Sequence, residues 1–329
     1  SAASDVYKRQ EEKDPLIPEI DTSVELQAGS RVAVVSKSTS GEFWGLVKKG
    51  MEQAIADVNE AYGFKKEDQV TMTFEGASDE KDVESQVNTI DAVIAENPDV
   101  LCVSASDMDS LQAQLEAAKE NGIPVVAFDS GVTDSKMVRA FRGTDNTRVG
   151  EIAAYRLATA IGKMGKVAVF SAQEKTQSIQ ERVSGFTNYI TNYPDIEVVE
   201  IVYQDQVDDM TAAMQEVLDK YPQLDGVFCD NADIADLYLD MKKDETKDSI
   251  VMVGVDATAK QQEAIRNSKE VGVVSQQPYA MGYQTIWTAL LTTAPKKSVE
   301  IKRNVRIDPA WIDSSNIDDP TYSSYLYAN

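Results

Sequence analysis

The chain has 329 residues, which is enough for about two domains of ordinary size. It carries 55 acidic and 32 basic residues, and the resulting net charge of -23 argues against a surface for nucleic acid or anionic membrane. It contains no histidine, which excludes Ser-His-Asp and Cys-His nucleophiles and every metal site that needs a histidine ligand.

The first 30 residues show little pattern. The stretch SAASDVYKRQ has no periodicity and lacks the apolar segment of a signal peptide, so we interpret residues 1–10 as a non-native leader. Residues 11–30 are acidic at their start and contain two prolines, which is typical of an extended linker. We therefore predict that residues 1–30 are leader and linker without ordered structure.

The rest of the chain is organised around the stretch from Arg31 to Gly50. Residues 31–35 form a β-branched run, residues 37–42 are polar or glycine, and apolar residues then recur at helical spacing from Phe43. A loop between a parallel strand and a helix lies at the carboxyl edge of the sheet, where α/β proteins bind ligands. This places the following side chains in a crevice: Lys37, Ser38, Thr39, Phe43 and Trp44.

The same unit repeats along the chain. Further strands are predicted at 69–75, 99–104, 124–129, 137–142, 166–171, 197–203, 226–229, 250–255, 271–275 and 299–307. Helices are predicted at 80–96, 109–121, 148–161, 179–193, 209–221, 234–242, 259–267 and 279–294. Two consecutive βαβ series indicate an α/β protein with two Rossmann-like lobes, each built on a parallel sheet. The only cysteines, Cys102 and Cys229, lie in apolar strands and are predicted to be buried free thiols.

Polar residues end many of these strands: Ser36, Ser104, Asp129, Ser171, Asp230, Asn231, Asp256 and Gln276. A single polar residue at a strand end is common and indicates little, but the whole set predicts a polar cleft between the lobes. Neither G-x-G-x-x-G nor G-x-x-x-x-G-K-[ST] occurs, so no nucleotide chemistry is indicated. We predict no cofactor and no metal site.

Several short motifs carry a family resemblance. They are KSTSGEFW from Lys37, FDSG with Asp129 and Ser130, TDN at 144–146, SIQERVSGF with Arg182 and Phe186, FCDN with Asn231, VGVDAT with Asp256, and SQQPYAMGY with Gln276 and Gln277. In this order, from Arg31 onward, the chain resembles the periplasmic ribose-binding type (type I) of sugar-binding proteins that serve ABC transporters.

The resemblance implies a fold of two lobes joined by a three-stranded hinge. The crossings are expected near 143–144, 276–278 and 303–306. The N-terminal lobe would then comprise residues 31–142 and 278–302, and the C-terminal lobe residues 143–277 and 303–329. A sugar that touches both lobes stabilises the closed form, which a membrane permease recognises. The resemblance also implies a monomeric, extracytoplasmic protein, periplasmic or anchored as a lipoprotein, without enzymatic activity.

The resemblance also implies a set of ligand contacts. Asp129, Asp256, Arg182, Asn231 and Gln276 suit the hydroxyls of a sugar, while Trp44 and Phe43 suit its apolar faces. Ser130 follows Asp129 in the same motif. Loop positions add Ser104 with Asp107, and Asp205 with Gln206. Gly41 and Glu42 stand where ribose-binding relatives carry Asn and Pro, which puts ribose itself in question.

The residues by themselves leave alternatives open. Either aromatic could belong to the core, Arg182 could form a surface salt bridge, and the aspartates could cap helices or sit in turns. Lys37 could pair with Asp129, bind a ligand oxygen or remain a solvated charge.

Three other functions share this scaffold. A sugar receptor for a sensor kinase or chemotaxis system has the same physical requirements as a transport protein. A repressor needs a basic helix-turn-helix of about 50 to 60 residues, whereas the 30 residues before Arg31 are acidic. A carbohydrate-acting enzyme would need an acid-base pair made without histidine.

Overall fold

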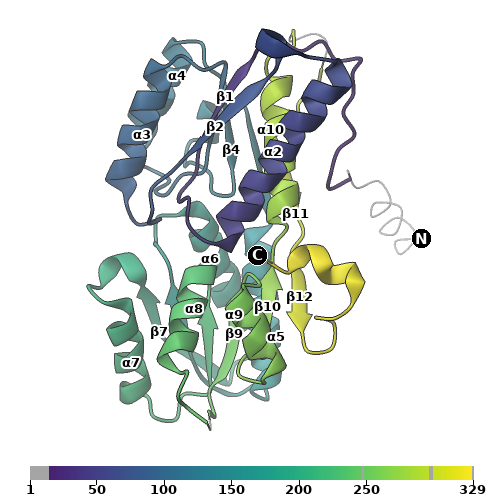
Figure 1. Cartoon of the computed structure of the whole chain (residues 1–329). Helices are drawn as coiled ribbons and strands as arrows, with labels where there is room; N and C mark the ends of the chain where they lie inside the picture. Colours follow the sequence, from purple (N-terminus) through teal and green to yellow (C-terminus); the bar gives the residue numbers. More distant parts are fainter. Residues whose placement is uncertain (1–14, 247, 296–298, 328–329) are drawn as a thin grey trace, which may run out of the picture.

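The computed structural model describes residues 15–246, 248–295 and 299–327. The leader expected at residues 1–10 and the first four linker residues lie outside these ranges. Two lobes are stacked one on the other (Figure 1), and each is built on a six-stranded sheet. The strand orders are β11-β5-β4-β3-β1-β2 in the first sheet and β12-β10-β9-β8-β6-β7 in the second.

The first lobe has only parallel strand pairs. Its strands are β1 (Arg31–Val35), β2 (Thr71–Glu75), β3 (Val100–Val103), β4 (Val125–Phe128), β5 (Ala140–Thr144) and β11 (Asn304–Ile307). Its helices are α2 (Glu42–Tyr62), α3 (Val83–Ala95), α4 (Gln112–Glu120) and α10 (Pro278–Leu291). Val34 and Phe128 pack with α2 and α10, whereas Val35 and Ala127 pack with α3 and α4. Both faces of the sheet are therefore covered, which explains the uninterrupted apolar runs.

The second lobe repeats this plan with one antiparallel edge. Its strands are β6 (Gly165–Ser171), β7 (Ile196–Tyr203), β8 (Gly226–Cys229), β9 (Val251–Val255), β10 (Gly272–Ser275) and β12 (Ala310–Asp313). Its helices are α5 (Asn146–Ala160), α6 (Gln177–Ile190), α7 (Met210–Lys220), α8 (Ala232–Met241) and α9 (Ala259–Arg266). Only β12 runs antiparallel, beside β10. Short 3₁₀ turns lie at Lys66–Asp68, Ser135–Met137, Gln204–Gln206 and Pro320–Tyr325.

The predicted fold class, two mainly parallel α/β lobes, is confirmed. Cys102 and Cys229 are buried free thiols on β3 and β8, as predicted. Within the described ranges, no helix combines the length and the apolar character needed to cross a membrane. β12 was not predicted, because its four residues lead into a tail rich in Asp and Ser.

The end of the chain is divided between the lobes differently from the prediction. Residues 303–329 were all assigned to the C-terminal lobe, but β11 pairs with β5 in the first sheet. The chain passes between the sheets three times: after β5, after β10, and between β11 and β12. The third crossing therefore follows Ile307, not 303–306, because the backbone of β11 completes the edge of the first sheet.

The prediction of an unstructured linker is wrong for residues 15–30. Val24 and Leu26 are 7% and 8% exposed and belong to the core of the first lobe. The Tyr62 hydroxyl donates to the Val24 carbonyl at 2.5 Å, and the Gln284 side-chain amide donates to the Leu16 carbonyl at 2.8 Å. The few apolar residues of this acidic segment suffice to dock it onto α2 and α10.

Glycines set the closest helix contacts in each lobe. An added Cβ at Gly50 of α2 would lie 2.0 Å from the Tyr279 carbonyl of α10. In the second lobe, a Cβ at Gly150 of α5 would lie 2.1 Å from the Arg182 carbonyl of α6. The contact at Gly150 fixes the turn of α6 that carries Arg182.

We expect Gly150→Ala to lower the free energy of unfolding by about 2 kcal/mol, because α5 and α6 must separate to admit the methyl group. The matched control is Gly45→Ala, in α2, where nothing lies within 4 Å of the new Cβ. Its better helix propensity should stabilise the protein by about 0.5–1 kcal/mol. Urea unfolding measures the free energy of unfolding of both variants. If Gly150→Ala stabilised the protein as much as Gly45→Ala, α5 and α6 would not be in close contact.

Candidate functional site: a polar cavity between the lobes

A cavity of about 50 Å³ lies between the two lobes. Eight of the predicted site residues line it: Lys37, Phe43, Trp44, Asp129, Arg182, Asn231, Asp256 and Gln276. They come from the carboxyl ends of the strands in both sheets and from the helices that follow, which is the placement the strand-end pattern predicted.

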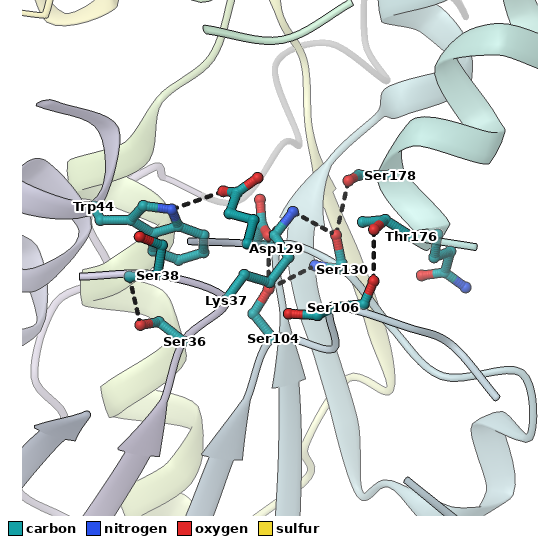
Figure 2. A network of polar contacts seen from close by, with 12 residues as sticks. Ser36, Lys37, Ser38, Trp44, Ser104, Ser106, Asp129, Ser130, Thr176 and Ser178 are labelled. Atoms are coloured by element: carbon teal, nitrogen blue, oxygen red, sulfur yellow. Dashed lines mark hydrogen bonds and ion pairs between the residues drawn. The ribbon is translucent and has the colours of Figure 1, made fainter. Parts of the chain in front are cut away.

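Lys37 and Asp129 form a buried ion pair at the first-lobe end of the cavity (Figure 2). The Lys37 Nζ lies 3.0 Å from Oδ2 of Asp129 and donates to the Ser130 hydroxyl at 3.1 Å. Ser104 donates to the same Asp129 oxygen at 2.6 Å. Burial alone would lower the pKa of Lys37, but the charges of Asp129 and Glu80 outweigh it and raise the pKa above its ordinary value. Of the three roles left open for Lys37, the structure shows pairing with Asp129.

Asp129 and Asp256 share an unusual backbone conformation. They follow β4 and β9, one in each lobe, with φ of 60° and 74°. Left-handed backbone costs a non-glycine residue about 1–3 kcal/mol and is concentrated at functional sites. The two lobes thus turn one carboxylate each into the cleft at corresponding strand ends.

Asp256 is held by three donors from separate parts of the chain. Gln276 Nε2 and the Tyr327 hydroxyl donate to its Oδ1 at 2.7 and 2.6 Å. The backbone amide of Ala232, at the start of α8, donates to Oδ2 at 2.9 Å. Gln276 also accepts a 2.7 Å bond from Thr144, so it links the ends of β5 and β10, from which two of the crossings leave.

Arg182 is 3% exposed, which excludes the surface salt bridge considered from sequence. Its Nε donates to Asn146 at 2.9 Å, and its Nη1 donates to the Asp230 carbonyl at 2.9 Å. Burial raises the pKa of the Asp230 carboxyl to about 6, although a bond from Ser171 and the charge of Arg182 oppose the shift. The guanidinium is oriented by these bonds while it lines the cavity.

The two aromatic residues belong to both the core and the cavity. Trp44 is 3% exposed and packs edge-on against Phe128 at a centroid distance of 6.3 Å. Its indole nitrogen donates to Glu80 at 2.9 Å, the dashed line that leaves Trp44 in Figure 2. Phe43 meets Trp44 at 4.9 Å and Tyr327 of the second lobe at 6.2 Å.

Three predicted contacts do not line the cavity. Ser104 and Ser130 are fully buried behind it and hold Asp129 and Lys37. Asp205 is exposed and accepts a bond from the Glu174 amide. It follows β7, the outer strand of the second sheet, so its loop lies off the centre of the cleft. The related loop candidates Asp107 and Gln206 are also absent from the lining.

Sequence reasoning missed several residues. Glu80 and Asp233 line the cavity from opposite lobes, and Tyr327 supports Asp256. At the cavity edge, partial removal from water and the Glu80 and Asp256 carboxylates raise the pKa of Asp233 to about 7. Glu80 follows β2, so the strand-end rule could have found it, whereas no local signal marks Tyr327.

Hydrogen bonds join the lobes beside the cavity. The hydroxyls of Ser130 and Ser178 lie 2.7 Å apart, and Thr176 donates to the Ser106 carbonyl at 2.5 Å, as Figure 2 shows. The Gly131 amide donates to Gln177 at 2.8 Å. The start of α6 therefore contacts the loops that follow β3 and β4. These contacts between the lobes show that the protein is in a closed conformation.

Comparison with known proteins now identifies the family. Residues 32–294 match the profile of the periplasmic binding protein domain. The chain belongs to this family. The resemblance drawn from its short motifs is thereby confirmed.

Relatives within the periplasmic binding protein family are moderately similar. The ribose import binding protein RbsB of Bacillus subtilis (strain 168) is 27% identical over 203 residues, which is 62% of this chain and 66% of that protein. RbsB of Escherichia coli (strain K12) is 24% identical over 58% of this chain and 64% of its own. The chain thus spans just under two thirds of the length of these curated relatives.

Solved structures match more of the chain. An ABC transporter solute binding protein from Agrobacterium vitis, with bound D-fucose, has a TM-score of 0.82 and 28% identity, covering 91% of this chain and all of its own. A carbohydrate transporter solute binding protein from Agrobacterium radiobacter, in complex with D-arabinose, has a TM-score of 0.81 and 28% identity, covering 91% and 99%.

Proposed function

We propose that this protein is an extracytoplasmic solute-binding protein that captures a small sugar in the interlobe cavity and delivers it to an ABC importer. One observation carries the proposal: charged and amide side chains from both lobes converge with two aromatic rings on one cavity. A sugar offers hydroxyls that charged groups bind strongly and apolar faces that aromatic rings cover.

Closure follows from the division of these groups between the lobes. Lys37 and Asp129 belong to the first lobe, and Arg182, Asn231 and Asp256 to the second, so only a closed protein offers all of them to one ligand. A ligand shifts an equilibrium between two states by its difference in affinity for them. Sugar binding would therefore favour the closed form, the form that an importer distinguishes from the empty protein.

The identity of the sugar is open within a defined class. The relatives named above bind or import ribose, D-fucose and D-arabinose, and these sugars support a monosaccharide ligand for this chain. Gly41 lines the cavity where the ribose-binding pattern has Asn, which removes an amide and its hydrogen bonds. We therefore infer a monosaccharide other than ribose as the preferred ligand.

The proposal places the protein outside the cytoplasm as a monomer that binds without chemical conversion. Its partner is the membrane permease of the importer, and a lipid anchor is compatible with the acidic N-terminal segment. A receptor role for a sensor kinase or chemotaxis system would use the same cavity. Incubation with the bound sugar followed by product analysis separates binding from turnover.

A thermal-shift screen against pentoses, hexoses, deoxysugars, sugar acids and polyols tests the proposal. A ligand at 100 times its dissociation constant should stabilise the protein by about 2.7 kcal/mol, seen as a rise in Tm of several degrees. Calorimetry of the best ligand should then give a single site. A panel without any stabilising sugar would contradict the proposed function.

A further inference from the structure

Tyr327, the last described residue of the chain, contacts residues that line the ligand cavity. Tyr327 is fully buried, and its hydroxyl donates to Oδ1 of Asp256 at 2.6 Å. Its ring lies 6.2 Å from Phe43, which belongs to the first lobe. Tyr327 thus contacts one cavity-lining residue from each lobe.

We propose that Tyr327 is a positioning residue of the ligand site, and that the C-terminal strap, residues 314–327, holds it there. The proposal rests on the ligand-binding function proposed above and adds a residue to it. A carboxylate accepts about four hydrogen bonds, and three donors already hold Asp256. The Tyr327 hydroxyl therefore helps to decide which acceptor position faces the ligand.

The backbone of the strap is anchored independently of that hydroxyl. The Tyr327 amide donates to the Ala257 carbonyl at 3.0 Å, and the Gln262 side-chain amide donates to the Tyr327 carbonyl at 2.9 Å. The Ser275 hydroxyl donates to the Tyr325 carbonyl at 2.5 Å. Two of these anchors lie beside a residue of the cavity, because Ala257 follows Asp256 and Ser275 precedes Gln276.

Apolar packing holds the rest of the strap on the second lobe. Ile317 is buried in a small cluster with Ile312 of β12 and Val273 of β10, and Tyr322 and Leu326 pack against it. Figure 1 shows this segment in yellow, beside β12 on the lower lobe. The strap is therefore fixed against β10, whose end carries Gln276, and against Ala257, which follows Asp256, and Tyr327 is its point of contact with the site.

The first test is Tyr327→Phe, which removes the hydroxyl and leaves the ring and the backbone anchors. A hydrogen bond to a charged group is worth enough to change affinity about tenfold. We expect Tyr327→Phe to raise the Kd of the best sugar of the panel about tenfold, with the Tm of the sugar-free protein lowered by no more than a few degrees. Calorimetry and thermal unfolding measure the two quantities.

Tyr325→Phe is the matched control. It lies two residues earlier in the strap, half-buried, with its ring 6.3 Å from that of Tyr322. It should leave the Kd unchanged. If Tyr327 had a purely structural role, Tyr327→Phe would lower the Tm of the sugar-free protein and leave the Kd unchanged. That result would overturn the proposal.

A second measurement does not depend on any sugar. In a crystal structure of sugar-free Tyr327→Phe, the Asp256 carboxylate should rotate from its orientation in the unsubstituted protein, whereas Tyr325→Phe should leave it in place. An unchanged carboxylate would overturn the proposal for Tyr327. If the unsubstituted protein binds no sugar, the proposed function fails, and the crystal structure still decides whether Tyr327 positions Asp256.

Discussion

Replacing Asp129 by alanine should lower the free energy of unfolding by about 3–5 kcal/mol and abolish sugar binding. The side chains of Asp129 and Lys37 are 3% and 6% exposed and lie 3.0 Å apart. Removing one partner of a buried ion pair leaves the other charge without compensation, which accounts for the size of the effect. For a protein of this size the loss corresponds to a fall in Tm of about 10 °C.

The double variant Lys37→Met with Asp129→Ala separates stability from binding. It removes both charges, and a buried pair replaced by apolar groups often costs little. We expect it to recover most of the lost stability without recovering sugar binding. Denaturant unfolding and calorimetry measure both effects. An Asp129→Ala variant as stable as the unsubstituted protein would contradict a buried pair, and an affinity unchanged in the double variant would remove both residues from the site.

Replacing Arg182 by methionine should raise the Kd of the sugar at least 100-fold. The guanidinium lines the cavity and is oriented by Asn146 and by the Asp230 carbonyl. Two charge-assisted hydrogen bonds to a ligand are worth about 3 kcal/mol together, which is more than a factor of 100 in Kd. Arg182→Lys keeps the charge but cannot reproduce the planar arrangement of donors. Its Kd should therefore lie between that of the unsubstituted protein and that of Arg182→Met.

The control for Arg182 is Arg148→Met on α5. The Arg148 side chain is 56% exposed and pairs with Glu151 on the same helix, at 3.7 Å. Arg148→Met should change neither the Kd nor the Tm measurably, because exposed ion pairs contribute little to stability. Calorimetry measures the Kd of the sugar for Arg182→Met, Arg182→Lys and Arg148→Met, and ranks the three variants by affinity. Equal affinities for Arg182→Met and Arg148→Met would remove Arg182 from the ligand site.

Local patterns were sufficient for the fold class and for most of the cavity. β1, β4 and β9 are apolar strands that end in polar residues, and their neighbours in the sheets are set by the regular alternation with helices. The strand-end rule therefore placed Lys37, Asp129 and Asp256 at one cleft from local sequence alone. Asp205 came instead from the resemblance, as a loop position of the second lobe, and local sequence could not exclude it, because the position of β7 at the sheet edge is not a local property.

The amino-acid sequence by itself determined the two α/β lobes, their helices and strands, and the chemical character of the cleft, because hydrophobic periodicity and turn residues act over short stretches of chain. Only the tertiary structure decided that β11 joins the first sheet, that residues 15–30 pack on α2 and α10, and that Tyr327 supports Asp256. These contacts join segments far apart in the chain. Their partners are chosen by the packing and hydrogen bonding of the whole fold, which a local pattern does not encode.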